Sequence, residues 1–168
     1  PRLELVSWAR RCVEETAFIY LFFESAPYGR HIKEGWGISI PAKLGWVVME
    51  SPCVLLMLAY ALIVKDKLEI MHIAFLFLWL LHYIHRTFIY PFKIKMTNPV
   101  MPISIAVSAF CFNLINVSIQ AFGIFYFTQY DENWIFNPVF MIGTLIFFVG
   151  MYINCLLYTS PSPRDQLQ

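Results

Sequence analysis

The sequence carries few charged residues and no excess of either sign. Only 14% of its 168 residues are Asp, Glu, Lys or Arg, and the formal net charge is +1. A protein that binds nucleic acid needs a basic surface to meet the phosphate backbone, and the sequence contains no helix-turn-helix, zinc-finger or RNA-reading motif. We therefore expect no nucleic acid among its partners.

Cysteine and glycine are scarce as well, and neither is clustered. The cysteines form no Cys-x-x-Cys pair and have no histidine at ligand spacing, so we expect buried free thiols and neither a disulfide framework nor a metal site. They are Cys12, Cys53, Cys111 and Cys155. His82 and His85 lack a further ligand nearby, which favours structural histidines. No Gly-x-Gly-x-x-Gly motif occurs, so a Rossmann-type nucleotide site is not expected.

Hydrophobic residues are abundant instead, at 59% of the chain, and they include 16 Phe, 9 Tyr and 5 Trp. This is the composition of an integral membrane protein. Long apolar runs predict one all-α domain, a polytopic membrane helix bundle of four to five transmembrane helices. The spans are predicted at residues 45–64, 70–92, 103–127 and 140–154, and residues 3–23 form either a first span or an interfacial helix.

The distribution of basic residues predicts an orientation for these spans. Loops rich in Lys and Arg tend to face the cytosol, which places the first and third loops on that side. The basic residues concerned are Arg30, Lys33, Lys43, Lys93 and Lys95. Glu50 then lies about 7 Å and Tyr83 about 13 Å from the cytosolic ends of their spans. Two ionisable groups at similar depth predict a pocket that opens toward the cytosol.

Ionisable side chains within the spans are candidate functional groups, because such groups usually face an interior cavity. On an ideal helix, His82, Tyr83 and Arg86 lie within about 100° of one another. Structural roles are possible for each candidate. Arg86 can snorkel to the headgroups, Glu50 can pair with a Lys at the helix mouth, and Tyr83 can be an interfacial aromatic. Asn116 and Gln120, one helical turn apart, can bond neighbouring helices.

The character of the chain changes after Asn154. Residues 155–168 contain two Ser-Pro steps and a polar end, which cannot continue a transmembrane helix. They are either a disordered terminus or a non-native tail, since residues 155–165 look like the translation of a sequencing adapter. We interpret residues 1–154 as the membrane domain and hypothesise that the natural reading frame was lost after Asn154.

Several short segments occur in an order that resembles the N-terminal part of the steroid 5-alpha-reductase family. The most specific is the His-Tyr-x-His-Arg-Thr stretch that begins at His82. The segments are Tyr28-Gly29-Arg30-His31, the stretch from Pro41 to Pro52, the stretch from Leu81 to Pro91, Met101-Pro102, the pair Asn116 and Gln120, Trp134 with Asn137-Pro138, and the stretch from Ile142-Gly143 to Asn154. The resemblance covers residues 28–154 and implies truncation from a larger bundle.

The resemblance implies a multi-pass enzyme of the endoplasmic reticulum that transfers hydride from NADPH to the double bond of a 3-oxo-delta-4 steroid. It implies that Glu50 and Tyr83 are catalytic and bind the steroid's 3-keto oxygen. By the same resemblance, Tyr28 and Gly29 lie near the substrate. It places Arg86, Asn116 and Asn154 on the cofactor side.

The chemistry suits these residue types. Conjugate reduction of an enone develops negative charge on the oxygen, and a tyrosine hydroxyl supported by a protonated, buried carboxyl can donate to it. Arg86 offers a fork for a dinucleotide phosphate. Met49, Ser51 and the loop at residues 96–99 depart from the family pattern, and the family's His-Ser-Asp and later cofactor-binding spans are absent. We therefore expect the fragment alone to be inactive.

Two other interpretations remain open at the level of sequence. The polar residues of a non-catalytic multi-span protein, such as a transporter or an assembly factor, would line a path or join helices. A related reductase would act on an enoyl-CoA or a polyprenal instead of a steroid.

Overall fold

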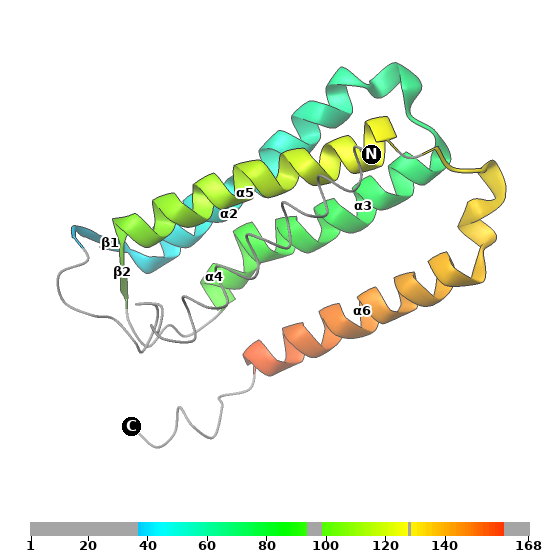
Figure 1. Ribbon diagram of the computed structural model, residues 1–168. Helices are drawn as coiled ribbons and strands as arrows, with labels where there is room; N and C mark the ends of the chain where they lie inside the picture. The colour runs from blue at the N-terminus through cyan, green and yellow to red at the C-terminus, as the bar shows by residue number, and fades with distance from the viewer. Residues whose placement is uncertain (1–36, 94–98, 128, 160–168) are drawn as a thin grey trace, which may run out of the picture.

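The computed structural model describes residues 37–93, 99–127 and 129–159, as well as the side chains of most of these residues up to Asn154. The predicted helix at residues 3–23 and the Tyr28-Gly29 motif lie outside this part of the chain, as do residues 160–168. The described residues form an elongated bundle of helices (Figure 1). The prediction of an all-α membrane helix bundle is confirmed.

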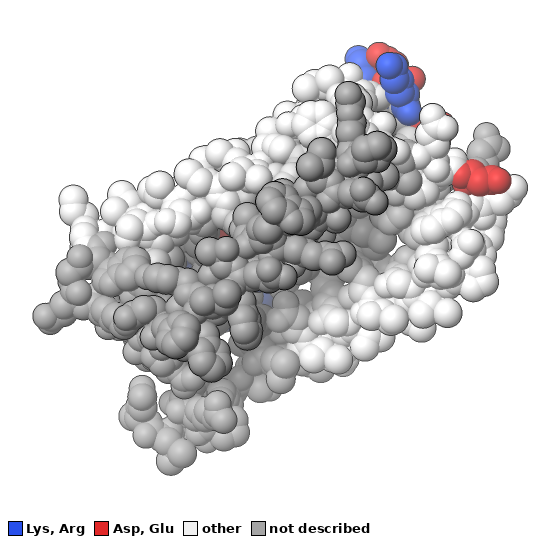
Figure 2. Space-filling view, in the orientation of Figure 1, with Lys and Arg blue, Asp and Glu red and all other residues white. Residues whose placement is uncertain are grey.

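Three helical segments of the described chain are long and apolar enough to cross a membrane. They are Ala42–Ile63, Ile70–Lys93 and Ile103–Phe127. A fourth helix, α6 (Pro138–Thr159), contains the shorter apolar stretch Pro138–Asn154. In Figure 2 most of the visible charged side chains lie at the end of the bundle that holds the turn Lys65–Lys67, and the described surface along the helices is mostly uncharged in this view. A surface of this kind suits contact with lipid.

Two proline-led helices, α2 (Ala42–Ile63) and α5 (Ile103–Phe122), are joined at their N-terminal ends by a small sheet. Strands β1 (Ser39–Pro41) and β2 (Val100–Pro102) pair antiparallel, with Ile40 opposite Met101. The first backbone N–H of each helix donates to the other segment: Ala42 N to Pro99 O at 2.8 Å, and Ile103 N to Ile38 O at 2.9 Å. The ribbon therefore satisfies helix-end donors and sets α2 beside α5.

The core lies between α2 and α5, which run side by side in Figure 1. Cys53 and Met57 from α2 and Val117 and Ala121 from α5 have no exposed surface. Small residues at such a contact allow two helix backbones to approach closely, which is the usual basis of helix association in membranes. At the other end, a Cβ on Gly45 would collide with the Met101 side chain, which would have to move to accommodate a larger residue.

The second of these segments, Ile70–Lys93, is not a uniform α-helix. It comprises α3 (Ile70–Ile84), a π-helical turn (His85–Ile89) and α4 (Tyr90–Lys93). Glu69 and His72 cap its start reciprocally in a capping box. A π-helical turn adds a residue to one turn, and such turns are frequent at functional sites. This turn contains Arg86 and Thr87, and both contact α2.

Helix α6 lies beside α3 and runs in the same direction (Figure 1). Ring contacts join Phe75 to Phe140 (centroids 5.6 Å apart) and His82 to Phe147 (6.3 Å). Most described side chains of α6 are otherwise exposed within the chain. The contacts fix the register of the two helices and leave space between them.

Candidate functional site

The site begins at Pro52, which lies inside α2. Proline has no backbone N–H, so the carbonyl of Val48, four residues earlier, loses its normal helical partner. The Ser51 hydroxyl donates to this carbonyl at 2.8 Å. The Ser51 hydroxyl therefore replaces the hydrogen bond that Pro52 removes.

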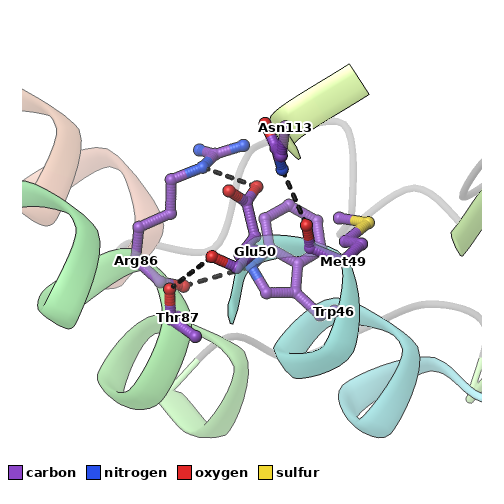
Figure 3. A network of polar contacts seen from close by, with 6 residues as sticks. All are labelled: Trp46, Met49, Glu50, Arg86, Thr87 and Asn113. Carbon is purple, nitrogen blue, oxygen red and sulfur yellow. Dashed lines mark hydrogen bonds and ion pairs between the residues drawn. The ribbon is translucent and has the colours of Figure 1, made fainter. Parts of the chain in front are cut away.

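The next two carbonyls of this turn accept hydrogen bonds from neighbouring helices. Asn113 of α5 donates through Nδ2 to the Met49 carbonyl at 2.7 Å, and Thr87 Oγ1 contacts the Glu50 carbonyl at 3.5 Å. Both side chains are buried. A buried polar group is costly unless it is hydrogen-bonded, so these contacts fix the turn of α2 that carries Glu50 (Figure 3).

Glu50 forms an ion pair with Arg86. The Arg86 Nε atom donates to Glu50 Oε1 at 2.8 Å, and Glu50 is 5% exposed. Trp46 holds Arg86 in two ways: its Nε1 donates to the Arg86 carbonyl at 3.1 Å, and the guanidinium carbon lies 5.1 Å from the centre of its ring. The sequence did not predict Arg86 as the partner of Glu50.

The outer part of the Arg86 guanidinium is free within the described chain. Only Nε takes part in a hydrogen bond to the described residues, and Figure 3 draws no interaction from the two terminal nitrogens. The Arg86 side chain is 34% exposed. Arginine carries five N–H donors in a planar fork, so four have no partner among the described residues.

Tyr83 lies close to this ion pair, beside the next turn of α2. Tyr83 packs against the buried cluster that contains Cys53, and its phenol is within electrostatic reach of the Cys53 thiol, Glu50 and Arg86. Trp79, one turn earlier on α3, stacks on the Tyr83 ring with centroids 4.6 Å apart. The structure therefore brings Glu50, Arg86 and Tyr83 together from two helices, although no described hydrogen bond joins Glu50 to Tyr83.

A cavity of about 510 Å³ opens beside Tyr83, between α3, α5 and α6. Its walls are mostly aromatic and aliphatic, with a few polar groups. They comprise Phe75, Leu78, Trp79, His82, Tyr83, Gln120, Ile124, Tyr130, Trp134, Val139, Phe140, Gly143, Thr144 and Phe147. An apolar pocket of a few hundred Å³ with few polar groups is typical of small-molecule sites.

A second cavity of about 460 Å³ shares His82 and Phe147 with the first and contains Asn154. Of the predicted cofactor-side residues, Asn154 lines this cavity, Arg86 lies at the ion pair, and the half-buried Asn116 lines neither cavity. In the part of the chain that the structure describes, no group of three or more His, Cys, Asp or Glu residues is placed to hold a metal ion. Cys53 is a buried free thiol as predicted, but Cys111 is exposed, so the prediction of burial is wrong for Cys111.

Four residues of the site were not identified as functional from the sequence: Trp46, Trp79, Thr87 and Asn113. Each contacts the backbone of another helix, and such contacts leave no periodic signature in a sequence. The available signal was Pro52, because a proline inside a span frees a carbonyl and calls for side-chain donors on its neighbours.

Comparison with known proteins identifies the family. A family model described as 3-oxo-5-alpha-steroid 4-dehydrogenase matches residues 99–160. Steroid 5-alpha-reductase DET2 of Arabidopsis thaliana is 38% identical over 81% of this chain and 54% of its own length, and the DET2 protein of Gossypium hirsutum is 36% identical over 82% and 55%. The 3-oxo-5-alpha-steroid 4-dehydrogenase 1 of Bos taurus is 28% identical over 90% of this chain and 60% of its length. The chain thus spans about half the length of the curated relatives it matches. It belongs to the steroid 5-alpha-reductase family.

Proposed function

We propose that this chain forms the steroid-binding half of an NADPH-dependent reductase of the endoplasmic reticulum membrane, which reduces the delta-4 double bond of a 3-oxo steroid. The observation that carries the proposal is the position of Tyr83: a hydrogen-bond donor at the wall of an apolar cavity, close to the Glu50–Arg86 ion pair. The relatives are named steroid 5-alpha-reductase and 3-oxo-5-alpha-steroid 4-dehydrogenase, and these names support the same reaction class.

The cavity has dimensions suited to a fused-ring lipid. Tyr83 lies eight residues after Phe75 on α3, and both line the cavity, so its wall extends about 12 Å along the helix. The end near Phe75 is lined by a cluster of rings, in which Tyr130, Trp134 and Phe140 contact Phe75. A flat apolar molecule with one ketone would place the ketone at Tyr83 and its opposite end against these rings.

Tyr83 would then stabilise the charge that develops during reduction. NADPH, when bound, supplies the hydride that adds to C5 of the enone. The electron pair of the C4–C5 double bond moves toward the 3-keto oxygen, Tyr83 donates its O–H to that oxygen, and a proton completes the reduction at C4. Sulfur is a weak acceptor, so the nearby Cys53 thiol competes poorly with a ketone oxygen for the Tyr83 O–H.

Glu50 would act through Arg86. A carboxylate has no donor for a ketone, so direct binding of the ketone by Glu50 requires its protonated form. While paired, Glu50 instead holds the Arg86 guanidinium in place. The four remaining N–H donors of Arg86 fit a phosphate of the dinucleotide, with Asn154 and Asn116 as further candidates on the cofactor side. Tyr28 and Gly29 stay predictions for the substrate side.

The substrate class can be tested with the chain itself in lipid nanodiscs. We expect saturable binding of a tritiated 3-oxo-delta-4 steroid, about tenfold tighter than a steroid that lacks only the 3-keto oxygen, because a single hydrogen bond is worth up to about 1.5 kcal/mol. A Tyr83→Phe variant should bind both steroids equally. Equal affinity of the unaltered chain for the two steroids would contradict the proposed role of Tyr83.

A further inference from the structure

We propose that Trp79 is a positioning residue that holds the Tyr83 hydroxyl in one direction. Nothing in the sequence pattern singles out Trp79, and it forms no part of the Glu50–Arg86 ion pair. Its importance for catalysis rests on the proposed function of Tyr83, but its effect on the orientation of Tyr83 can be tested without a steroid.

The first argument is that Trp79 is anchored to another helix. Its indole Nε1 donates to the backbone carbonyl of Cys53 at 2.8 Å. Cys53 has no exposed surface and belongs to the packed contact between α2 and α5. The acceptor is therefore a fixed point of the bundle, and the indole plane cannot turn without breaking this bond in a water-poor environment.

The second argument is that the anchored indole covers one face of the Tyr83 ring. The two residues are four positions apart on α3, which places their side chains on the same helix face. Their ring centroids are 4.6 Å apart and their planes differ by 32°. His82 contacts the Tyr83 ring edge-on, with centroids 5.0 Å apart and planes at 89°. A phenol held between two rings has lost most of its freedom to rotate.

The third argument is that both aromatic side chains meet one residue of α2. The Cys53 carbonyl accepts the hydrogen bond from Trp79, and Tyr83 packs against the same cluster with its phenol near the Cys53 thiol. Both aromatic side chains thus contact the same turn of α2, immediately after Glu50 and Pro52. The tether through Trp79 is what keeps the hydroxyl aimed at this turn and at the adjoining cavity.

Trp134 provides a matched control. It lines the same cavity, but its ring contacts are with Phe75, Tyr130 and Phe140 and not with Tyr83. Replacement of either tryptophan by phenylalanine removes one indole N–H and a similar volume from the cavity wall. Only the change at Trp79 removes the tether.

The first measurement is the infrared S–H stretching band of Cys53 in the full chain in nanodiscs, isolated by difference against a Cys53→Ala variant. Because this band responds to hydrogen bonding at the thiol, Tyr83→Phe defines its position when the hydroxyl is gone. We expect Trp79→Phe to move the band toward that position and Trp134→Phe to leave it unchanged. A band that stays in place in Trp79→Phe overturns the proposal.

The second measurement separates positioning from cavity shape. For Trp79→Phe, we expect the preference for the 3-oxo over the 3-deoxy steroid to fall from about tenfold to about twofold or less, because the hydroxyl is no longer aimed. Binding of the 3-deoxy steroid should stay within about twofold of the unaltered chain, which also shows that the variant folds. Equal weakening of both steroids would mean that Trp79 only shapes the cavity, and would overturn the proposal. Absence of any preference in the unaltered chain would refute the function proposed for Tyr83, while the S–H band would still decide the role of Trp79.

Discussion

Replacement of Tyr83 by phenylalanine is expected to lower turnover by about 10²- to 10³-fold, the usual cost of removing one donor to a developing oxyanion. This chain matches only about half of the length of its relatives. The measurement therefore requires a protein that also contains the other half of the relatives' sequence. A hybrid of residues 1–154 of this chain with the remaining part of the Arabidopsis relative meets this need. Turnover of a 3-oxo-delta-4 steroid at saturating NADPH, with product quantified by chromatography, gives the effect directly.

Tyr60 offers the control for this change. It is also a tyrosine of the bundle, but its hydroxyl contacts Ser118 Oγ of α5 at 3.3 Å and does not line either cavity. Tyr60→Phe should leave turnover within about threefold, because only one partly buried hydrogen bond is lost. If Tyr83→Phe kept more than about a tenth of the turnover, the hydroxyl would not be the donor that the mechanism requires.

Replacement of Arg86 by methionine is expected to destabilise the chain by about 3–5 kcal/mol. The change leaves Glu50, with only 6% of its side chain exposed, as a buried carboxylate without a partner. It also removes the cation that lies over the Trp46 ring. The free energy of unfolding in mixed micelles, measured by titration with a denaturing detergent, reports the effect.

Replacement of Glu50 by glutamine should lower the free energy of unfolding by less than Arg86→Met does. In Glu50→Gln the unpaired group is Arg86, whose side chain is 34% exposed and can turn toward water or headgroups. A double variant, Glu50→Gln with Arg86→Met, should recover much of the stability lost in Arg86→Met alone, since no buried charge remains. A double variant as unstable as Arg86→Met, or a Glu50→Gln variant that is equally unstable, would show that the ion pair is not what stabilises this part of the bundle.

The spans could be predicted from sequence because apolar length is a strong signal. The charged turn Lys65–Lys67 separates two apolar runs, and Pro102 and Pro138 mark the starts of two helices at positions close to those predicted. The ribbon of β1 and β2 was not predicted. Strands of three residues are too short to show a period of two, and only the folded chain brings them together.

The candidate site could be predicted only in part. Ionisable groups inside apolar spans pointed to Glu50, Tyr83 and Arg86, and the structure places all three in one region. Their pairing was not predictable, because it depends on the π-helical turn at Arg86 and on the turn of α2 before Pro52. From the sequence, Asn113 in the interior of α5 could bond any neighbouring helix. Only the structure shows that it donates to the Met49 carbonyl.

The central claim, that this chain positions a 3-oxo-delta-4 steroid for hydride addition, is tested most directly by isotope transfer in the hybrid protein. With NADPH deuterated at the transferable position, we predict a 5-alpha-reduced product that carries one deuterium at C5, identified by mass spectrometry and NMR. The hybrid with Tyr83→Phe should form this product far more slowly. A hybrid that is folded and inserted, but forms no deuterated product while the intact Arabidopsis relative does so in the same membranes, would contradict the account.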